Sequence, residues 1–537
     1  MSKSSELKAA VRSLQERPGD PAVAQQLCAL SAEDPDAAKD AHQEVLKVEP
    51  FEHTVDLGLP ARQIYRRHNL VMPQPVAVVE PESREELKAT VQRAATDWRS
   101  LRGIGSEYAF SNIAFTEGFA IRMPPKMNRM LAVDVNVMKP LREQLVSFEA
   151  GATVGRISDY LDRYGLAFHN QPGFDELTYV GAMSAGGHGS GISIGPLSAH
   201  VRSLHMLTVN QEHRAVEIRV EPRDGITDPQ KFRAAHPDVE LLQDDDAFRA
   251  AVVSAGSFGV IYSLVISVRK QHFLRETRQK FRWADVKARL PELLGSKYHS
   301  IAIWVNPYLV KGETHCVLGT YEEDAGPRRG ARGIGIIFGG TRVLTDIVGF
   351  WARTNPKAIP SLVDAAISST QSANVVMPAR EALSFGPPNK IPVMASNSGF
   401  DVKDTVAATE ATMRLLQERA KDHNLYMTSP LGLRFVRGTD AFLSPQYGRD
   451  TCMMETPTLS STPRGGETLA AIHSMLARQF RARPHWGQIN LHEAAVLQGL
   501  FPRLRDFVDA FAAFNPHGFF DNAFTDQMGL RNLADTI

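Results

Sequence analysis

The first half of the chain alternates between short apolar runs and amphipathic stretches. Residues 75–81 (PVAVVEP) form an apolar run typical of a strand, and residues 83–98 then carry apolar side chains at helical spacing. Ser83, followed three residues later by Glu86, is the pattern of a capped helix N-terminus. The order of strand, glycine turn and amphipathic helix returns at 145–168. The pattern therefore predicts strands that are connected through short helices.

Further strands are predicted where apolar and polar residues alternate, at 201–209 and 213–220. Residues 247–270 predict a helix, a glycine turn and a long strand. We therefore expect residues 56–275 to form one α+β domain of mixed sheets and short helices. Residues 1–55 are rich in Ala, Glu, Lys and Gln and predict a helical N-terminal extension, which we expect to serve in packing or oligomerisation.

The second half of the chain predicts another α+β domain. We expect this domain at 276–480, with an apolar insertion at 325–390, and a C-terminal segment at 481–537 that returns to the first domain. The apolar stretch 333–352 is interrupted by Arg342 and Asp346. It therefore falls short of the roughly 20 apolar residues that a membrane-spanning helix needs.

The composition narrows the class of protein. The chain has 537 residues, too many for one hydrophobic core, and its formal net charge of +0 gives no electrostatic reason to bind nucleic acid or an anionic membrane. Cys28, Cys316 and Cys452 are far apart and form neither a disulfide framework nor a metal-binding pair, so no metal site is expected. The first residues contain no apolar signal-peptide core, which favours a cytoplasmic protein.

Two glycine-rich segments are candidates for binding phosphate. Residues 103–111 read GIGSEYAFS, and residues 181–195 read GAMSAGGHGSGISIG. Glycine lets backbone N–H groups approach an anion closely because no Cβ intervenes. One such segment would be an ordinary turn, but two in one domain favour a long ligand such as a dinucleotide. Tyr108 stands where a Rossmann fingerprint needs its third glycine, and no Gly-Lys-Ser/Thr follows, so neither that motif nor a P-loop is predicted.

The order of these segments resembles the flavin-binding domain of the vanillyl-alcohol oxidase family, the FAD-binding PCMH-type flavoproteins. The resemblance rests on RGIGSEYAFS, EAGATVGRISDYLDRYGL, YVGAMSAGGHGSG and SAGSFGVI. Later in the chain, LRFVRGTDAFLSPQYGRD (433–450), RPHWGQ (483–488) and FNPHGFFDNAF (514–524) resemble the sugar-1,4-lactone oxidase and alditol oxidase branch. The resemblance implies a two-part FAD-binding domain and an α+β substrate (cap) domain over the flavin.

The resemblance also implies which residues bind FAD. The first glycine loop would hold the pyrophosphate, the second would flank the pyrophosphate and the flavin, and a turn near residue 259 would lie on the adenine side. His485 would lie near the flavin ring. The implied FAD-binding residues are Arg102, Gly103, Ile104, Gly105, Ser106, Glu107, Tyr108, Ala109, Ser111, Gly173, Thr178, Gly181, Ala182, Ala185, His188, Gly191, Gly259, Val260, Ile261 and His485.

The first loop departs from the family pattern at Tyr108. Many relatives carry there a histidine that is bonded covalently to the flavin. Tyrosine does not normally form that bond, so we expect non-covalent FAD and a flavin that is a weaker oxidant.

The substrate side departs from the pattern in three places. Alditol oxidase relatives carry Glu-x-Arg on a strand, whereas residues 432–434 read Gly-Leu-Arg, so that Arg434 remains and the glutamate is absent. A lysine after His-Trp-Gly is replaced by Gln488, and a histidine on the facing strand is replaced by Glu455. These differences imply a substrate other than simple lactones or alditols.

The reaction implied is hydride transfer from a C–H bond to flavin N5, with a base that accepts the O–H proton. Glu455 is the candidate base, because apolar neighbours raise the pKa of a carboxyl group. Arg434 would bind a substrate oxygen or stabilise reduced flavin, His485 would orient the ring or relay a proton, and Gln488 would contact substrate hydroxyls. Three of these residues also have a structural interpretation. Glu455 would then be a surface carboxylate at a strand edge, Arg434 the partner of a salt bridge to Asp450, and His485 a core histidine packed beside Trp486.

Three functions stay open from the sequence. The first is an FAD-dependent oxidase that acts on a CH–OH group of a polyol, sugar-derived or biosynthetic small molecule, with O2 as acceptor and H2O2 as product, which Pro172 and Gly173 favour. The second is an oxidase of a larger, sterol-like alcohol, suggested by the apolar stretch 333–352, or a dehydrogenase with another acceptor. The third is a non-catalytic flavin-binding homologue.

Overall fold

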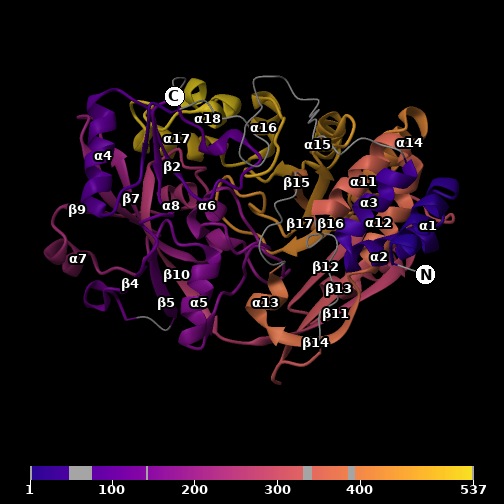
Figure 1. The fold of residues 1–537 in the computed structure, drawn as a ribbon. Helices are drawn as coiled ribbons and strands as arrows, with labels where there is room; N and C mark the ends of the chain where they lie inside the picture. The colour runs from indigo at the N-terminus through magenta and orange to yellow at the C-terminus, as the bar shows by residue number, and fades with distance from the viewer. Residues whose placement is uncertain (1–2, 47–74, 141–142, 331–341, 385–392, 535–537) are drawn as a thin grey trace. The chain divides into compact units, whose positions relative to one another are not determined.

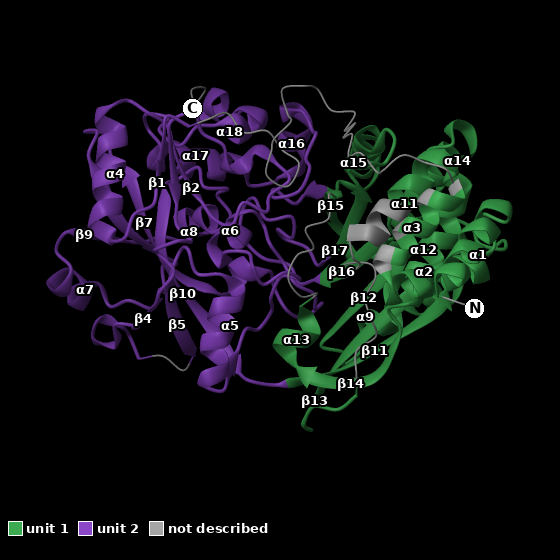
Figure 2. Cartoon of the chain, viewed as in Figure 1, with its two compact units in different colours: residues 1–70, 273–435, 452–482 green, residues 71–272, 436–451, 483–537 purple. Residues whose placement is uncertain are grey.

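The chain folds into two compact units, each assembled from segments that are distant in the sequence (Figures 1 and 2). The computed structural model describes residues 3–46, 75–140, 143–330, 342–384 and 393–534. Unit 1 comprises residues 1–70, 273–435 and 452–482, and unit 2 comprises residues 71–272, 436–451 and 483–537. The helical extension therefore belongs to unit 1, and a short segment that the sequence placed inside the second domain, 436–451, belongs to unit 2.

Unit 2 contains two sheets. The first is parallel, with the strand order β1 (Ala77–Val79), β3 (Phe119–Arg122), β2 (Leu101–Ile104). The second has the order β4 (Met130–Leu131), β5 (Gln144–Glu149), β10 (Val260–Lys270), β7 (Val201–Val209), β8 (Ala215–Glu221), β9 (Val239–Gln243), with β6 (Leu166–Ala167) beside β10. Its strands pair antiparallel except β8 with β9. The α+β class predicted from the sequence is confirmed.

Several helices of unit 2 begin at a polar side chain that caps them, and the cap at Ser83 is the one that the sequence indicates. Helix α4 (Arg84–Thr96) starts at Ser83, whose Oγ accepts from the N–H of Glu86 at 3.1 Å. Helices α5 (Val154–Arg163) and α6 (Tyr179–Ser184) start at Thr153 and Thr178 in the same way. The others are α7 (Pro229–Ala235), α8 (Asp245–Ala251), α16 (Ala494–Leu500), α17 (Leu504–Phe514), α18 (Ala523–Met528) and α19 (Leu530–Ala534).

The C-terminal segment is tied into unit 2 through buried aromatic side chains. The ring of Phe258 lies 5.0 Å from that of Phe507 and 5.1 Å from that of Phe514, both on α17. Rings of this size bury a large apolar area. This packing explains why the chain returns to unit 2 after residue 482.

Unit 1 is built on one sheet with helices on both faces (Figure 2, green). Within this unit the strand order is β14 (Ser372–Pro378), β11 (Phe273–Arg282), β13 (His315–Asp324), β12 (Ser300–Val305), β16 (Leu431–Val436), β17 (Thr451–Leu459), β15 (Val393–Asp401). The helices that contact this sheet are α9 (Trp283–Leu294), α12 (Ile359–Ser368), α13 (Ala379–Leu383), α14 (Thr405–His423) and α15 (Gly465–Phe480).

The side chains of β17 show which helices lie on which face. The Sδ atom of Met454 accepts a hydrogen bond from Thr412 of α14 at 3.6 Å, so Met454 points to the face that α14 covers. Successive residues of a strand point to opposite faces. Glu455 therefore points to the other face, where Ile367 of α12 packs against Trp304.

The N-terminal extension is helical, as predicted, and packs within unit 1. Helices α1 (Lys3–Glu16), α2 (Pro21–Glu33) and α3 (Pro35–Leu46) pack against one another and against α11 (Arg342–Thr354) and α12. His42, which is fully buried, accepts a hydrogen bond from the indole N–H of Trp351 at 3.3 Å through Nε2. Its Nδ1 lies 2.7 Å from the carbonyl oxygen of Ala38 and donates to it.

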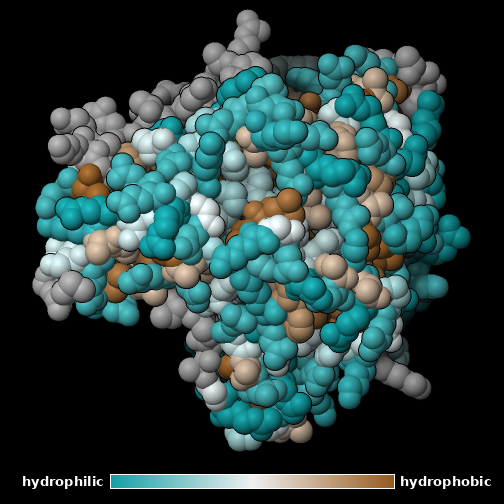
Figure 3. Space-filling view, turned by 90° about the vertical axis from the view of Figure 1, so that its right-hand side faces the viewer, coloured by the Kyte–Doolittle hydropathy of each residue, from teal (hydrophilic) through white to brown (hydrophobic). Residues whose placement is uncertain are grey.

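The apolar stretch 333–352 lies partly outside the described residues, and its described part belongs to α11. Among the described residues no helix combines the length and apolarity that crossing a bilayer requires. The face seen in Figure 3 is mostly hydrophilic, with hydrophobic residues in small separate patches.

Candidate functional site

The first glycine loop closes tightly against the segment that precedes α6. A Cβ atom built on Gly105 would lie 2.2 Å from Thr178 Oγ1, so this close approach requires glycine. The Ser106 hydroxyl donates to the carbonyl oxygen of Glu176 at 2.6 Å and accepts from the N–H of Thr178 at 3.1 Å. The structure therefore joins the first predicted FAD-binding loop to the start of the second.

The two residues in the middle of the loop have protein partners. The Tyr108 hydroxyl donates to the carboxylate of Glu176, and burial together with this hydrogen bond raises the pKa of Tyr108 above its usual value. Glu107 has a left-handed backbone, with φ of 59°, and its carboxylate lies 3.2 Å from Nε of Arg122. Neither Glu176 nor Arg122 was identified from the sequence, because no motif signals either of them.

The side chain of Arg102 has a structural role. It is 1 % exposed, and its guanidinium donates to the carbonyl oxygens of Ile113, Gly256 and Phe520 at 2.7 to 3.1 Å. Burial lowers its pKa to about 9. These bonds connect β2 to the C-terminal segment, so any contact that Arg102 makes with a phosphate must come through its backbone.

The segment 485–487 holds both glycine loops. The N–H of Trp486 donates to the carbonyl oxygen of Ala185 at 3.1 Å, and the hydroxyl of Ser111 donates to the carbonyl oxygen of Trp486 at 2.5 Å. The N–H of Phe110 donates to the carbonyl oxygen of Gly487 at 2.8 Å. Residues more than 370 positions apart in the chain therefore form one cradle.

His485 is neutral and has a defined tautomer. Burial lowers its pKa to about 4, and its Nδ1 accepts the N–H of Gly487 at 3.1 Å. The ring proton must therefore be on Nε2. His485 lies 5.8 Å from the ring of His188, measured between centroids. His485 can donate a hydrogen bond from Nε2, but in this tautomer it is not a proton acceptor there.

Several polar groups of this cradle are available to a ligand. Among the described residues, the N–H groups of Ser106 and Ala109 have no hydrogen-bond acceptor. The side-chain oxygen of Gln488 is buried and likewise lacks a partner within the described chain. Buried polar groups normally have partners. Donors on a glycine loop and an orphaned buried oxygen fit a polar, phosphate-bearing ligand such as FAD.

The remaining residues predicted to bind FAD also lie in unit 2. Val260 and Ile261 pair with Leu207 and Met206 at the start of β10, and Val260 lies beneath Gly103. The others are Ile104 at the end of β2, Gly173 and Thr178 before or at the start of α6, Gly181 and Ala182 in α6, Gly191 after it, and Gly259 before β10.

Arg434 and Glu455 come together in unit 1, on neighbouring strands β16 and β17. A Cβ atom built on Gly432 would lie 3.7 Å from the Cβ of Glu455 and 4.0 Å from its Oε2, so Gly432 faces Glu455. Burial raises the pKa of Glu455, and the charge of Arg434 opposes this rise. Burial likewise lowers the pKa of Arg434. The pair combines a carboxylate that can accept a proton with a fixed positive charge.

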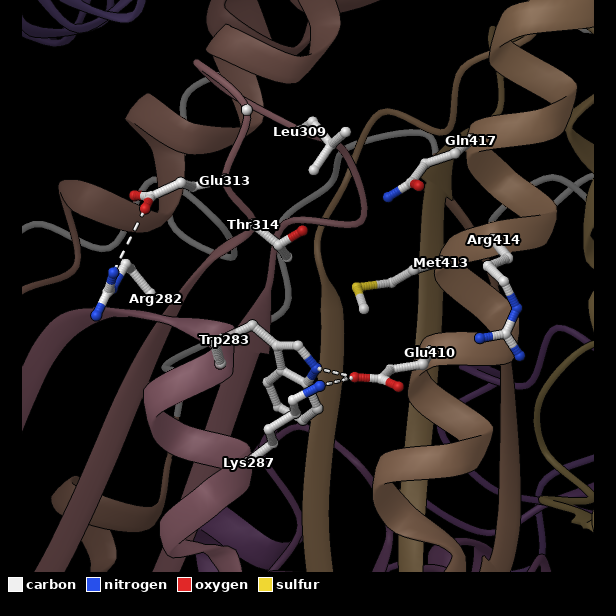
Figure 4. A pocket seen from close by; sticks show the side chains of 12 residues that line it. Arg282, Trp283, Lys287, Leu309, Glu313, Thr314, Glu410, Met413, Arg414 and Gln417 are labelled. Atoms are coloured by element: carbon white, nitrogen blue, oxygen red, sulfur yellow. Dashed lines mark hydrogen bonds and ion pairs between the residues drawn. The ribbon is translucent and has the colours of Figure 1, made fainter.

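A pocket lies in unit 1, between α9, the turn after β12 and α14 (Figure 4). This pocket has a volume of about 410 Å³. Lys287 Nζ and Trp283 Nε1 both donate to one carboxylate oxygen of Glu410, at 2.6 and 3.3 Å. The pocket is on the α14 face of the sheet, whereas Glu455 points to the opposite face. It is therefore separate from the Arg434–Glu455 pair.

Comparison with known proteins agrees with this arrangement. Residues 75–216 match the FAD binding domain family, and residues 265–528 match the D-arabinono-1,4-lactone oxidase family. The chain belongs to the FAD-binding PCMH-type flavoproteins, in the branch of sugar-lactone and alditol oxidases. This flavoprotein is an oxidoreductase that acts on CH–OH groups, and its cofactor is FAD.

Individual relatives cover nearly the whole flavoprotein. It is 26% identical over 456 residues to L-gulono-1,4-lactone dehydrogenase of Mycobacterium tuberculosis, covering 84% of this chain and 96% of that protein. It is 24% identical to alditol oxidase of a Streptomyces species, covering 85% and 95%. A solved structure of a solvent-stable cholesterol oxidase superposes with a TM-score of 0.68 at 15% identity, covering 84% of this chain and 94% of that one. At that identity the likeness shows the fold alone.

Proposed function

We propose that the flavoprotein oxidises a CH–OH group of a polyol or sugar-derived small molecule, with Glu455 as the base. The observation that carries the proposal is the pair formed by Glu455 and Arg434 on one face of the unit 1 sheet. A carboxylate whose pKa is raised by burial suits proton abstraction near neutral pH. The adjacent guanidinium suits a substrate oxygen that gains negative charge.

The roles of the chain's own groups follow from their geometry. Bound FAD supplies the acceptor for the hydride. Glu455 would take the hydroxyl proton, and Arg434 would bind and orient the oxygen that loses it. The N–H groups of Ser106 and Ala109 would hold phosphate oxygens, and the orphaned oxygen of Gln488 would accept a hydrogen bond from a cofactor or substrate group. His485 would donate from Nε2 rather than act as a base.

The substrate class is tested by anaerobic reduction of the flavin. Purified protein is mixed with L-gulono-1,4-lactone, D-arabinono-1,4-lactone, xylitol and cholesterol, and bleaching of the flavin absorbance is followed. We expect reduction by at least one polyhydroxylated compound and not by cholesterol. Reduction by cholesterol alone would replace the proposal with a sterol oxidase. If FAD is bound but no compound of a broad alcohol panel bleaches it, the non-catalytic interpretation is favoured.

The base is tested with Glu455→Gln, which keeps the size of the side chain and removes its basicity. We expect the rate of flavin reduction to fall by about 10²–10⁴-fold, the usual contribution of a general base. Glu410→Gln is a matched control, because Glu410 lies in the pocket on the opposite face of the same sheet. Equal rates for Glu455→Gln and the wild type would reject the assignment.

We further propose O2 as the electron acceptor. The relatives include proteins named as oxidases and one named as a dehydrogenase. Similarity to them therefore does not identify the electron acceptor of this protein. Pro172 and Gly173, which precede the second glycine loop, motivate the proposal. Stopped-flow mixing of the reduced protein with O2 should give rapid reoxidation and H2O2. Reoxidation over minutes would identify a dehydrogenase.

We also infer a reducing, cytoplasmic environment. All three cysteines are free and buried, and burial raises the pKa of each thiol to about 12. A chain with no disulfide between its cysteines suits a reducing compartment. Cell fractionation with detection of the native protein would check the location.

A further inference from the structure

Three polar residues form a buried network on the face of the unit 1 sheet to which Glu455 points. Glu276 and Arg278 of β11 form an ion pair at 2.8 Å, with side chains 0% and 6% exposed. Arg278 donates to the hydroxyl of Tyr321 on β13 at 3.2 Å, and its guanidinium carbon lies 5.0 Å from the centre of the Trp304 ring. Ser372 of β14 donates to Glu276 at 3.0 Å. We call Glu276, Arg278 and Tyr321 the Tyr321 network.

Stability alone does not account for this network. Its surroundings are apolar, because Tyr321, Trp304, Val317 and Ile367 belong to one buried hydrophobic cluster. Removing two charges from water costs several kcal/mol per ion, and apolar residues of similar volume often stabilise a core as well or better. The chain of bonds from Ser372 to Glu276, and from Glu276 to Arg278, instead fixes the position of the Tyr321 hydroxyl, to which Arg278 donates. A hydroxyl held in one position can orient a neighbouring side chain.

The strand register brings Tyr321 close to Arg434. Tyr321 pairs with Ser300 on β12, and Ala302, two residues further along β12, pairs with Arg434 on β16. All four side chains therefore point to one face. Only the small side chains of Ser300 and Ala302 separate Tyr321 from Arg434 across β12. Glu455 lies on the other side of Arg434, on β17. On this face Arg434 thus has a carboxylate on the next strand and an anchored phenol two strands away, and both interact with it electrostatically.

Trp304 of β12 lies on the same face of the sheet. Its ring leans toward β13, since a Cβ built on Gly319 would lie 3.1 Å from its Cζ3. The ring therefore lies against Gly319 and beside Arg278.

We propose that Tyr321 is a positioning residue, anchored by Arg278 and Glu276, that sets the orientation of the Arg434 guanidinium and so the place where the substrate oxygen binds. The proposal rests on the proposed function, in which Arg434 binds that oxygen. It explains why a buried ion pair is kept on β11, three strands away from Arg434. Tyr321 acts through Arg434 and does not itself touch the reacting atoms.

The first test is Tyr321→Phe, which keeps the ring and removes the hydroxyl. Tyr308→Phe is the matched control: Tyr308 is also buried in unit 1, and its hydroxyl accepts the N–H of Met427 at 2.7 Å. We expect Tyr321→Phe to raise KM by about tenfold, equivalent to the loss of one hydrogen bond involving a charged group, with a smaller change in kcat. Tyr308→Phe should lower the melting temperature to a similar degree and leave KM unchanged.

The second test asks whether the Glu276–Arg278 ion pair acts through Tyr321. Glu276→Gln combined with Arg278→Gln removes both charges together, so no buried charge is left unpaired. If the pair acts through Tyr321, this double variant raises KM as much as Tyr321→Phe does, and adding Tyr321→Phe to it raises KM no further. Additive effects would overturn the coupling.

A crystal structure of Tyr321→Phe separates this inference from the proposed function. We expect the Arg434 guanidinium to move or to occupy more than one position. An unmoved Arg434, or an unchanged KM, would overturn the inference. If the wild-type protein oxidises no compound of the panel, the proposed function fails, while the position of Arg434 in the variant crystal still decides whether Tyr321 orients it.

Discussion

Gly432 and Glu455 face one another across the neighbouring strands β16 and β17, and a Cβ on Gly432 would lie 4.0 Å from Oε2 of Glu455. The absence of a side chain at residue 432 leaves room for the carboxylate of Glu455. An acidic group is therefore present at this point of the sheet, although it comes from the strand next to the one that carries Arg434.

This relationship predicts that the acid can be moved from one strand to the other. Glu455→Ala should lower kcat/KM by about 10²–10⁴-fold. Adding Gly432→Glu to that variant should raise kcat/KM again by at least tenfold. The Cβ atom of the new glutamate would lie 3.7 Å from the position of the Glu455 Cβ, so its carboxylate can reach the same region. The double variant with Gly432→Gln is the control, since it fills the same space without a base. Equal activity of the two double variants would show that position 432 cannot supply the base.

The pKa of Glu455 predicts the pH dependence. Burial raises this pKa above the ordinary 4.5, and a base must be ionised to accept a proton. The value of kcat/KM should therefore rise with pH through the raised pKa. Glu455→Gln should remove this acidic limb, while His485→Gln should keep it, because His485 titrates at about 4 in the folded protein. A limb that is lost in His485→Gln and kept in Glu455→Gln would reverse the assignment of the two residues.

The contact between Gly105 and Thr178 predicts a steric defect and its rescue. Gly105→Ala would place a Cβ 2.2 Å from Thr178 Oγ1, so the flavin content per chain and the melting temperature should both fall. Adding Thr178→Ala removes the clashing hydroxyl and leaves the nearest contact at 3.4 Å, to the Cβ of residue 178. The double variant should therefore bind more FAD than Gly105→Ala alone. Thr178→Ala by itself measures the cost of losing the cap of α6.

Tyr108 predicts that the flavin is held without a covalent bond. Its hydroxyl is engaged by Glu176, and tyrosine does not form the usual link to flavin. Precipitation of the protein with acid should leave yellow FAD in the supernatant. Tyr108→Phe should still release all its flavin and should bind FAD more weakly, because the loop loses its bond to Glu176. Flavin that stays in the washed pellet of the wild-type protein would disprove non-covalent binding.

His42 predicts a pH-dependent attachment of the N-terminal helices. Burial lowers its pKa from the ordinary 6.5 to about 4. A depressed folded-state pKa contributes stability above 6.5 that is lost as pH falls toward 4. The loss at about pH 5 is roughly 2 kcal/mol. The protection of the α1–α3 amides, measured by hydrogen exchange and corrected for the intrinsic exchange rate at each pH, should therefore fall between about pH 7 and pH 5. His42→Gln, which can keep both hydrogen bonds without titrating, should flatten this dependence.

Local sequence patterns were sufficient to predict many of the helices and strands of this protein. The capping pair Ser83 and Glu86 marked the start of α4, and alternation marked β7 and β8, because caps and periodicity depend on neighbours in the sequence. The glycine loops and the segments 433–450, 483–488 and 514–524 were sufficient to identify the family and its cofactor. The α+β class and the helical extension also followed from the sequence.

Tertiary structure alone decided which groups meet. No local signal indicates that the backbone of Trp486 forms hydrogen bonds with Ala185 and Ser111, or that the Tyr108 hydroxyl donates to Glu176. None indicates that the Arg102 guanidinium donates to backbone carbonyl oxygens. These contacts join residues tens to hundreds of positions apart and depend on strand register, in which a shift of one residue turns every side chain to the other face. The same register places Glu455 opposite Gly432. The sequence by itself determined the flavin-binding family, and the packing of distant strands and loops determined the arrangement of the candidate catalytic groups.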